Sequence, residues 1–178
     1  IAKKFLAREG IKVAAYVESI GKATAKMQAA QIDTWLERKL SSPLFTPDQE
    51  DEKEFARLLQ EAIEEGDSLG GVVRVVAEGV KAGCGDPIYE KLSANLAKAL
   101  ASIPAVKGVL LGDAFDLACG SGSTGNDGYK IDDEGKVQFK SNHCGGILGG
   151  ISTGMPIDLQ VLFKPASSIR IPQETVTF

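Results

Sequence analysis

The stretch KSNHCGGILGGISTG, residues 140–154, contains five glycines, three hydroxyl side chains, one amide and the only histidine of the chain. Glycine has no Cβ, so paired glycines let the backbone take a positive φ or pass very close to another group. Two Gly-Gly steps, at 145–146 and 149–150, enclose Ile147 and Leu148. The pattern predicts a buried segment that bends twice against something flat or polar. Tight turns around one short core strand would give the same pattern.

Around this stretch, alternating and valine-rich runs predict a chain rich in strands. Strands are expected at residues 12–20, 68–81, 105–111, 114–119 and 157–163, with a hairpin over 129–139 that turns at 132–135. Glycine makes up 20 of the 178 residues, more than the usual ~7%. This excess favours a turn-rich sheet protein over a helix bundle.

Start and stop signals predict three helices between these strands. The first covers residues 1–9 and ends at Gly10. The second has Thr46 as its N-cap, Pro47 at its first position and Gly66 at its end, with the acids of 48–54 facing solvent. Its apolar positions follow helical spacing at Phe55, Leu58, Leu59, Ala62 and Ile63.

The third helix is expected to open at Asp86-Pro87. Its apolar stripe consists of Ile88, Leu92, Leu96 and Leu100. Residues 22–42 are ambiguous, and a short helix could include Trp35, Leu36 and Leu40. Strands joined by short turns and interrupted by helices predict an α+β fold with antiparallel sheets layered with helices, in a single domain over residues 1–178.

Charge and cysteine usage exclude several classes of function. The net charge of -4 and the pI near 5.1 give no electrostatic footprint for nucleic acid. No apolar run of about 18 residues predicts a membrane span, and no secretory leader opens the chain. Three cysteines without CxxC spacing and a lone histidine favour reduced thiols in a cytoplasmic protein and disfavour a zinc site.

Residues 120–125, GSGSTG, match the glycine pattern of dinucleotide-binding turns. In those folds a helix opens at the glycines so that its N-terminus faces the pyrophosphate. Here residues 126–128, Asn-Asp-Gly, follow instead and predict a turn into the hairpin. The motif therefore predicts a mobile surface loop. It also argues against a nicotinamide-dependent flavin reductase activity within this segment.

The Gly-rich stretch gains meaning from the blocks that surround it in order. SNHCGGILGGISTGMPI at 141–157 is followed by FKPASSI at 163–169 and PQETV at 172–176. The preceding blocks are IAKKFL at 1–6, GDSLGG at 66–71, SIPAVKG at 102–108 and LGDAFD at 111–116. Together they resemble the carboxyl-terminal half of chorismate synthase, and the resemblance covers essentially the whole chain.

The resemblance implies a β-α-β sandwich fold and a place in the shikimate pathway of aromatic amino acid biosynthesis. The family converts 5-enolpyruvylshikimate 3-phosphate to chorismate by 1,4-elimination of phosphate and a proton. It requires reduced flavin mononucleotide (FMN), although the reaction has no net redox change. The family also implies a cytoplasmic homotetramer.

The resemblance further implies which residues contact FMN. Lys164, Pro165, Ala166, Ser167 and Ser168 match a KPTSS-type loop, in which Ala166 replaces a common threonine and so lacks one hydroxyl. Read from the residues, the lysine, the two serines and the turn after the proline could face an anion. Pro104 and Ala105 match a second flavin-contacting block, and Gly149 matches a flavin-contacting glycine. We expect the Gly-rich turn and the KPASS turn to meet around the flavin and its phosphate.

Two side chains next to the Gly-rich turns receive structural roles. His143 could donate a hydrogen bond near the flavin. Because the family block often carries asparagine there, packing or hydrogen bonding is expected of His143 rather than a catalytic role. Cys144 is expected to be a small buried thiol. No acidic pair for acid–base chemistry stands out from the sequence.

The family's remaining functional blocks are expected outside these residues. The two active-site histidines and most substrate-binding arginines would precede Ile1, with a SARET-type flavin block immediately before it, and an RHDP-type block would follow Phe178. We therefore expect no catalytic residue in the chain, no activity of the chain alone, and weak or absent FMN binding. The alternative is a non-catalytic module for oligomerisation or for binding a phosphate ligand.

Overall fold

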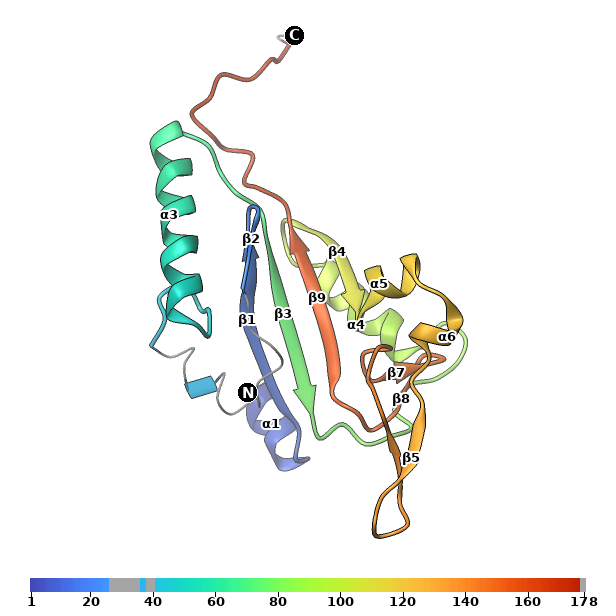
Figure 1. The fold of residues 1–178 in the computed structure, drawn as a ribbon. Coiled ribbons are helices and arrows are strands. Elements are labelled where there is room, and N and C mark those ends of the chain that lie inside the picture. The colour runs from blue at the N-terminus through green and yellow to red at the C-terminus, as the bar shows by residue number, and fades with distance from the viewer. Residues whose placement is uncertain (26–35, 38–40, 177–178) are drawn as a thin grey trace.

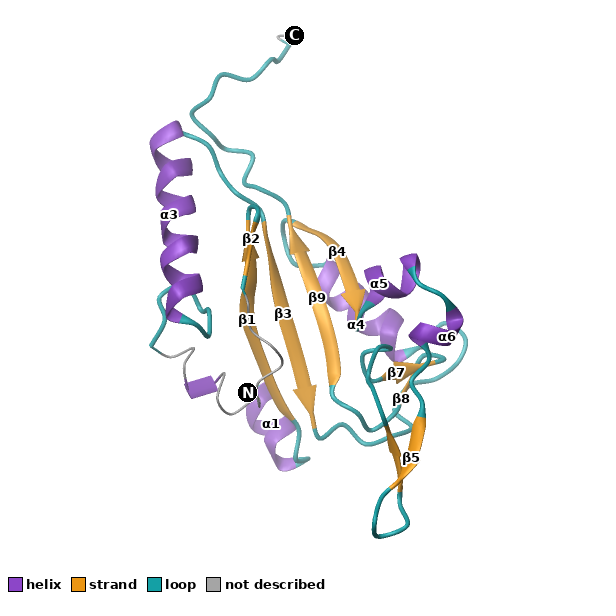
Figure 2. Ribbon diagram, viewed as in Figure 1, coloured by secondary structure: helices purple, strands orange, loops and turns teal. Residues whose placement is uncertain are grey.

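A computed structural model describes residues 1–25, 36–37 and 41–176. Its centre is a five-stranded antiparallel sheet with the strand order β2–β1–β3–β9–β4 (Figures 1 and 2). These strands are β1 Lys12–Ile20, β2 Ala23–Thr24, β3 Gly71–Glu78, β4 Val106–Leu111 and β9 Ile157–Phe163. Two small hairpins pair β5 Tyr129–Ile131 with β6 Val137–Phe139, and β7 Ile147–Leu148 with β8 Ile151–Ser152.

The helices lie around this sheet and its hairpins. They are α1 Ala2–Arg8, α3 Gln49–Glu65, α4 Leu92–Ala101, α5 Ala114–Cys119 and α6 Gly122–Gly125. In Figure 1, α3 stands beside β1 and β2, while α4, α5 and α6 lie on the side of β4. The predicted α+β fold with antiparallel sheets is confirmed. Among the described residues, no helix is long and apolar enough to cross a membrane.

The core has one cluster on each face of the sheet. On one face, Ile157 and Leu159 of β9 pack with Ile147 of β7. Leucines of α4 cover this cluster at positions 92, 96 and 100. On the other face, Ala14 and Tyr16 of β1 pack with Val76 of β3 and with Leu36. Because side chains alternate along a strand, this arrangement requires the register that pairs Ala14 with Val76.

Helix α3 begins two residues later than its predicted N-cap implies. Asp48 is the cap, because its Oδ1 accepts hydrogen bonds from the N–H groups of Glu50 and Asp51, at 2.7 and 3.4 Å. The prediction of Thr46 is wrong, since that side chain is buried and its hydroxyl has no hydrogen-bond partner among the described residues. Asp51 is buried as well, contrary to the prediction for the acids of 48–54. Gly66 ends the helix in the left-handed region, as predicted.

Helix α4 also begins later than the sequence predicts. It starts at Leu92, whose N–H donates to the carbonyl of Gly150 at 2.8 Å. Residues 86–90 form a closed turn before it, with the Asp86 N–H bonded to the Glu90 carbonyl. Ile88 therefore lies outside the helix and is exposed, so its place in the predicted stripe is wrong. The three leucines of that stripe pack as predicted.

Residues 114–119 form helix α5, so the predicted strand is wrong. The chain leaves the sheet at Gly112, which takes a φ of 54° at the end of β4. The first helical bond follows at once, from the Leu117 N–H to the Asp113 carbonyl. Phe115 is 74% exposed, so its apolar character does not mark a buried strand.

Residues 120–125 are also not a loop throughout, because 122–125 form the single turn α6. The element before that turn is helix α5 and not a strand. The strand–turn–helix context of a dinucleotide site is thus missing, which agrees with its rejection from the sequence.

The remaining element predictions are largely confirmed. The helix before Gly10 is present. The structure also has the predicted strands, within a residue or two, at 12–20, 105–111 and 157–163, and the hairpin with its turn at 132–135. The predicted strand at 68–81 is shorter and covers only 71–78. Trp35 and Leu40 of the ambiguous region lie outside the described residues.

Candidate functional site

The KPASS loop leaves the end of β9 as an exposed turn. The Lys164 N–H donates to the Ala105 carbonyl at 2.9 Å. The Lys164 ammonium donates to Ser167 Oγ at 2.6 Å, and Ser68 Oγ donates to the Ala166 carbonyl at 2.7 Å. The loop therefore holds an exposed ammonium group and hydroxyls in one place, a donor set that suits an anion.

The turn at Pro104 and Ala105 lies directly beside this loop. It joins α4 to β4, and Ala105 takes a φ of 68°. A positive φ is uncommon for a residue with a Cβ and concentrates at sites where the surroundings enforce it. Here the Ala105 carbonyl accepts the N–H of Lys164. The structure therefore brings seven of the eight predicted flavin-contacting residues together.

A third segment, residues 66–71, supports the same loop. The Gly66 carbonyl accepts the N–H of Arg170 at 2.8 Å. A Cβ at Gly70 would lie 2.7 Å from the Phe163 carbonyl oxygen and 3.1 Å from Pro165 Cδ, so only glycine fits there. From the sequence, this block was expected to end a helix at Gly66, to begin a strand and to match one of the family's blocks, but not to contact the KPASS loop. Its two adjacent glycines were the signal that another backbone passes close by.

The Gly-rich stretch forms the two predicted bends. Four glycines, at 145, 146, 149 and 150, have φ between 62° and 91°, and β7 between them pairs with β8. Three of the four pack against other backbone or side-chain atoms. A Cβ at Gly149 would meet no atom within 4 Å, so the space above this residue is open. Gly149 can therefore accept a flat group against its backbone.

Gly149 and the KPASS loop lie at opposite ends of α4. Gly150 accepts the N–H of Leu92, the first residue of that helix, while Ala105 follows its C-cap Ser102. A helix of 10 residues spans about 15 Å. The two turns thus have no direct contact, contrary to the expectation that they meet. A ligand that contacts both has to extend along this helix.

Next to the first bend, His143 pairs with an aspartate. Its Nδ1 lies 2.7 Å from Asp113 Oδ2, and this hydrogen bond raises the pKa of His143 above its ordinary value. His143 therefore makes a hydrogen bond, with a partner that the sequence did not indicate, while its place near a flavin stays a prediction. Both side chains border a cavity of about 190 Å³ that is also lined by Asp116, Leu117, Thr124 and Gly125.

Cys144 was predicted to be buried, but its side chain is only half-buried. Burial raises the pKa of its thiol, and the neighbouring Asp127 raises it further. The thiols of Cys84, Cys119 and Cys144 are free, and the first two are exposed.

An ionic network that sequence reasoning did not single out crosses three strands of the sheet. Arg74 of β3 forms two hydrogen bonds with Asp158, at 2.8 and 2.6 Å, and one with Glu18, at 2.9 Å. Gln160 donates to the second oxygen of Glu18. Burial, followed by the charge of Glu18, raises the pKa of Tyr16 beside the network to about 12. The network is largely sheltered and joins β1, β3 and β9 to one another.

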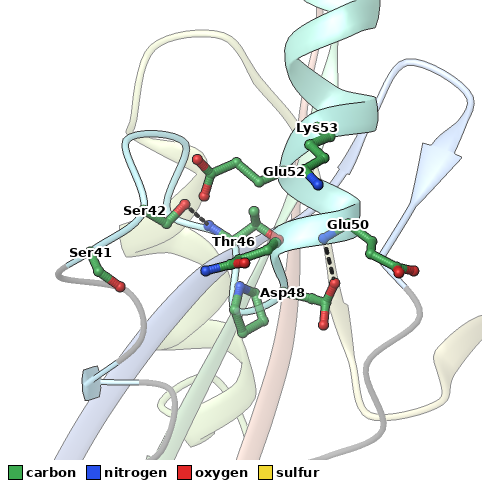
Figure 3. A pocket seen from close by; sticks show the side chains of 9 residues that line it. Ser41, Ser42, Thr46, Asp48, Glu50, Glu52 and Lys53 are labelled. Atoms are coloured by element: carbon green, nitrogen blue, oxygen red, sulfur yellow. Dashed lines mark hydrogen bonds between the residues drawn. The ribbon is translucent and has the colours of Figure 1, made fainter.

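A larger cavity, of about 640 Å³, lies at the first turn of α3 (Figure 3). Figure 3 shows hydroxyl and acidic side chains around it, including Ser42, Thr46 and Asp48. None of the predicted flavin residues lines it. It lies at the other end of α3 from Gly66 and the KPASS loop, so it is not part of the candidate site.

Comparison with known proteins identifies relatives of this arrangement. A family model described as chorismate synthase matches residues 1–178. Chorismate synthases of Pyrococcus abyssi and Protochlamydia amoebophila are 47% and 44% identical over 98% and 99% of this chain. A crystal structure of chorismate synthase matches 92% of the chain with a TM-score of 0.84 and 35% identity. The chain covers 48% of each of these two relatives and 52% of the crystallised chain, about half their length.

Proposed function

This chain belongs to the chorismate synthase family, and we propose that it supplies the flavin-facing part of an enzyme that forms chorismate. The proposed reaction is the 1,4-elimination of phosphate from 5-enolpyruvylshikimate 3-phosphate in aromatic amino acid biosynthesis. The observation that supports it best is the hydrogen bond from Lys164 to Ala105, because it joins the two blocks that resemble flavin-contacting segments.

The residues of the candidate site fit reduced FMN as a cofactor. Lys164, Ser167 and Ser168 are exposed and offer an ammonium group and hydroxyls to a phosphate. Pro165 and Ala166 shape the turn between them. Gly149 leaves open space where a ring could lie against the backbone. When bound, reduced FMN would supply reversible one-electron chemistry, in which the electron lent as phosphate leaves returns to the flavin, so that the reaction has no net redox change.

The roles of this chain's residues are binding and positioning. Lys164 would neutralise part of the phosphate charge, and the serine hydroxyls would orient it. Pro104 and Ala105 would form the border of the site on the side of α4. The ring of Pro104 and the backbone carbonyls would make the contacts. We assign no proton transfer to a residue of the chain, and we place the proton-handling groups in the half of the family's length outside these residues.

Reconstitution of the missing half tests the proposal. The chain is mixed with all the parts of the Pyrococcus abyssi relative that lie outside the match, together with reduced FMN and 5-enolpyruvylshikimate 3-phosphate. Chorismate should form only when the chain and these parts are all present, and size-exclusion chromatography reports whether they assemble. An assembled complex without turnover would contradict the proposal.

A second candidate function is self-association without catalysis. The hairpin β5–β6 exposes Tyr129, Ile131 and Val137, and an exposed apolar surface favours a protein partner. A homotetramer, as the family resemblance implies, would satisfy this surface. Stable tetramers of the chain without turnover in the reconstitution would favour this alternative. For the whole protein we propose a cytoplasmic location, which the free thiols support.

A further inference from the structure

The segment that leads into the first glycine bend is held by a carboxylate from outside it. Asp127, two residues before β5, accepts hydrogen bonds at Oδ1 from Ser141 Oγ at 2.6 Å and from the His143 N–H at 2.7 Å. Its Oδ2 accepts the Cys144 N–H at 3.0 Å. One side chain therefore fixes the backbone at two successive residues and the hydroxyl of a third.

The segment that Asp127 fixes is bonded directly to the glycine turns. Within the same segment, Asn142 Oδ1 accepts the N–H of Gly146 at 2.8 Å, and its Nδ2 donates to the Pro156 carbonyl at 2.8 Å. Gly146 in turn accepts the N–H of Thr153 at 2.9 Å, which closes the base of the hairpin β7–β8. Gly149 lies at the tip of that hairpin. The base that Asp127 holds thus determines where the tip lies.

Asp127 keeps its negative charge in this environment. Partial burial alone would raise the pKa of its carboxyl group. The hydrogen bonds from Cys144, Ser141 and His143 outweigh burial and hold the pKa well below its ordinary value. Hydrogen bonds to an ionised acceptor are stronger than neutral ones. Asp127 therefore accepts these hydrogen bonds as a carboxylate throughout the neutral pH range.

We propose that Asp127 is a positioning residue of the flavin site, which fixes residues 141–144 and thereby sets the place of Gly149. The inference rests on the proposed function for its flavin consequence, but the structural hold can be measured without flavin. Asp127 has no contact with the KPASS loop in the described structure, so it acts on the flavin only through the Gly-rich turns.

The chain offers a closely matched control in Asp132. Its Oδ1 accepts the N–H groups of Glu134 and Lys136, at 3.0 and 2.8 Å, and its Oδ2 accepts Gln138 Nε2 at 2.7 Å. It therefore also accepts three hydrogen bonds, but at the exposed tip of the hairpin β5–β6, away from the glycine turns. Asp127→Asn and Asp132→Asn change the same chemical group in two places.

Amide hydrogen exchange of the 178-residue chain tests whether Asp127 fixes residues 141–144. We expect Asp127→Asn to speed exchange at residues 143–150 by about tenfold or more, because it loses a charge-assisted acceptor. The amides of β3 and β9 should keep their protection, which shows that the fold persists. Asp132→Asn should leave 143–150 unchanged. Equal exchange in the two variants would overturn the proposal. If Asp127→Asn does not fold, Ser141→Ala, which removes one donor, should give a smaller increase at the same amides.

Flavin binding tests the consequence separately. The chain is assembled with the unmatched parts of the Pyrococcus abyssi relative, and FMN binding is followed by the change in the FMN absorption spectrum during titration. Asp127→Asn should weaken FMN binding about tenfold with no change for Asp132→Asn. Faster exchange with unchanged FMN binding would overturn the positioning role. An assembled wild-type protein that gives no flavin signal would count against the proposed function instead, while the exchange data still decide the hold.

Discussion

At the scale of single residues, side chains from distant positions hold the molecule together. The Arg74 guanidinium joins carboxylates from β1 and β9, at Glu18 and Asp158, which are 12% and 20% exposed. Charges this sheltered are costly when they lose their partner. No local pattern could predict this network, because its members are separated by more than 50 positions in the chain.

Replacement of Arg74 should destabilise the fold far more than replacement of a similar arginine at the surface. Arg74→Met leaves two sheltered carboxylates unpaired and should lower the free energy of unfolding by about 2–3 kcal/mol. Arg57 on α3 also pairs with two carboxylates, Glu54 and Glu61, but all three side chains are about half exposed. Arg57→Met should therefore cost less than about 1 kcal/mol. Urea unfolding of the two variants measures the difference, and equal losses would contradict this account of the network.

The single histidine gives a direct measurement of its pair with Asp113. The pair raises the folded-state pKa of His143, so its stabilisation is fully present below the unfolded value of about 6.5 and is lost as pH rises through the folded value. The imidazole resonance in an NMR titration should therefore have a midpoint above about 6.5. Asp113→Asn should return the midpoint toward that value, while Asp116→Asn serves as a control that removes a nearby carboxylate. An unshifted wild-type midpoint would contradict the pair.

At the scale of elements, the start of α3 shows how a local signal can mislead. Thr46 followed by Pro47 is a good helix start by composition, yet two positions later Asp48 takes the cap. An aspartate and a threonine are both acceptable caps, and tertiary burial of the threonine decides between them. The helix itself and its end at Gly66 were predictable because helical spacing and a left-handed glycine are local features.

Two substitutions separate these alternatives for the cap. Asp48→Ala should lower the free energy of unfolding by about 1 kcal/mol, because the first-turn N–H groups of α3 lose their acceptor. Thr46→Val should leave the free energy of unfolding within about 0.5 kcal/mol or increase it, because the buried hydroxyl has no partner to lose among the described residues. Thermal unfolding of both variants checks the order. A larger loss for Thr46→Val would mean that the threonine is the cap after all.

Predictions from the sequence succeed where neighbouring residues determine the structure and fail where distant residues do. The strand Ile157–Phe163 was predictable because its alternating apolar residues are buried, with Val161 only 2% exposed. The helix at 114–119 was not predictable. Its apolar Phe115 lies on the surface, so the spacing of apolar residues there does not distinguish a helix from a strand. In the candidate site, the KPASS and Pro104–Ala105 blocks came from the family resemblance. The separation of Gly149 from them depends on α4, which only the tertiary structure reveals.

At the scale of the whole molecule, α4 separates two halves of the proposed flavin site. The exposed donors around Lys164 lie at its C-terminal end, and the open space over Gly149 lies at its N-terminal end. Both surfaces are open in the described structure. Since the chain spans about half the length of its relatives, we expect the rest of the family's length to supply the opposing wall.

The chain alone should therefore bind FMN weakly or not at all. By the proposal, its own residues would cover the cofactor from one side only, because further flavin-contacting blocks are expected outside these residues. Isothermal titration of the 178-residue chain with FMN checks this expectation. A submicromolar Kd would mean that the surfaces around α4 are sufficient by themselves, and the need for an opposing wall would be withdrawn.

The most direct test of the central claim compares the binding of FMN with that of riboflavin, which lacks the phosphate. The protein is the chain assembled with the unmatched parts of the Pyrococcus abyssi relative. If the KPASS loop holds the phosphate, FMN should bind at least about tenfold more tightly than riboflavin. Lys164→Met should remove most of that preference and leave riboflavin binding unchanged. A preference for FMN that persists in Lys164→Met would contradict the account.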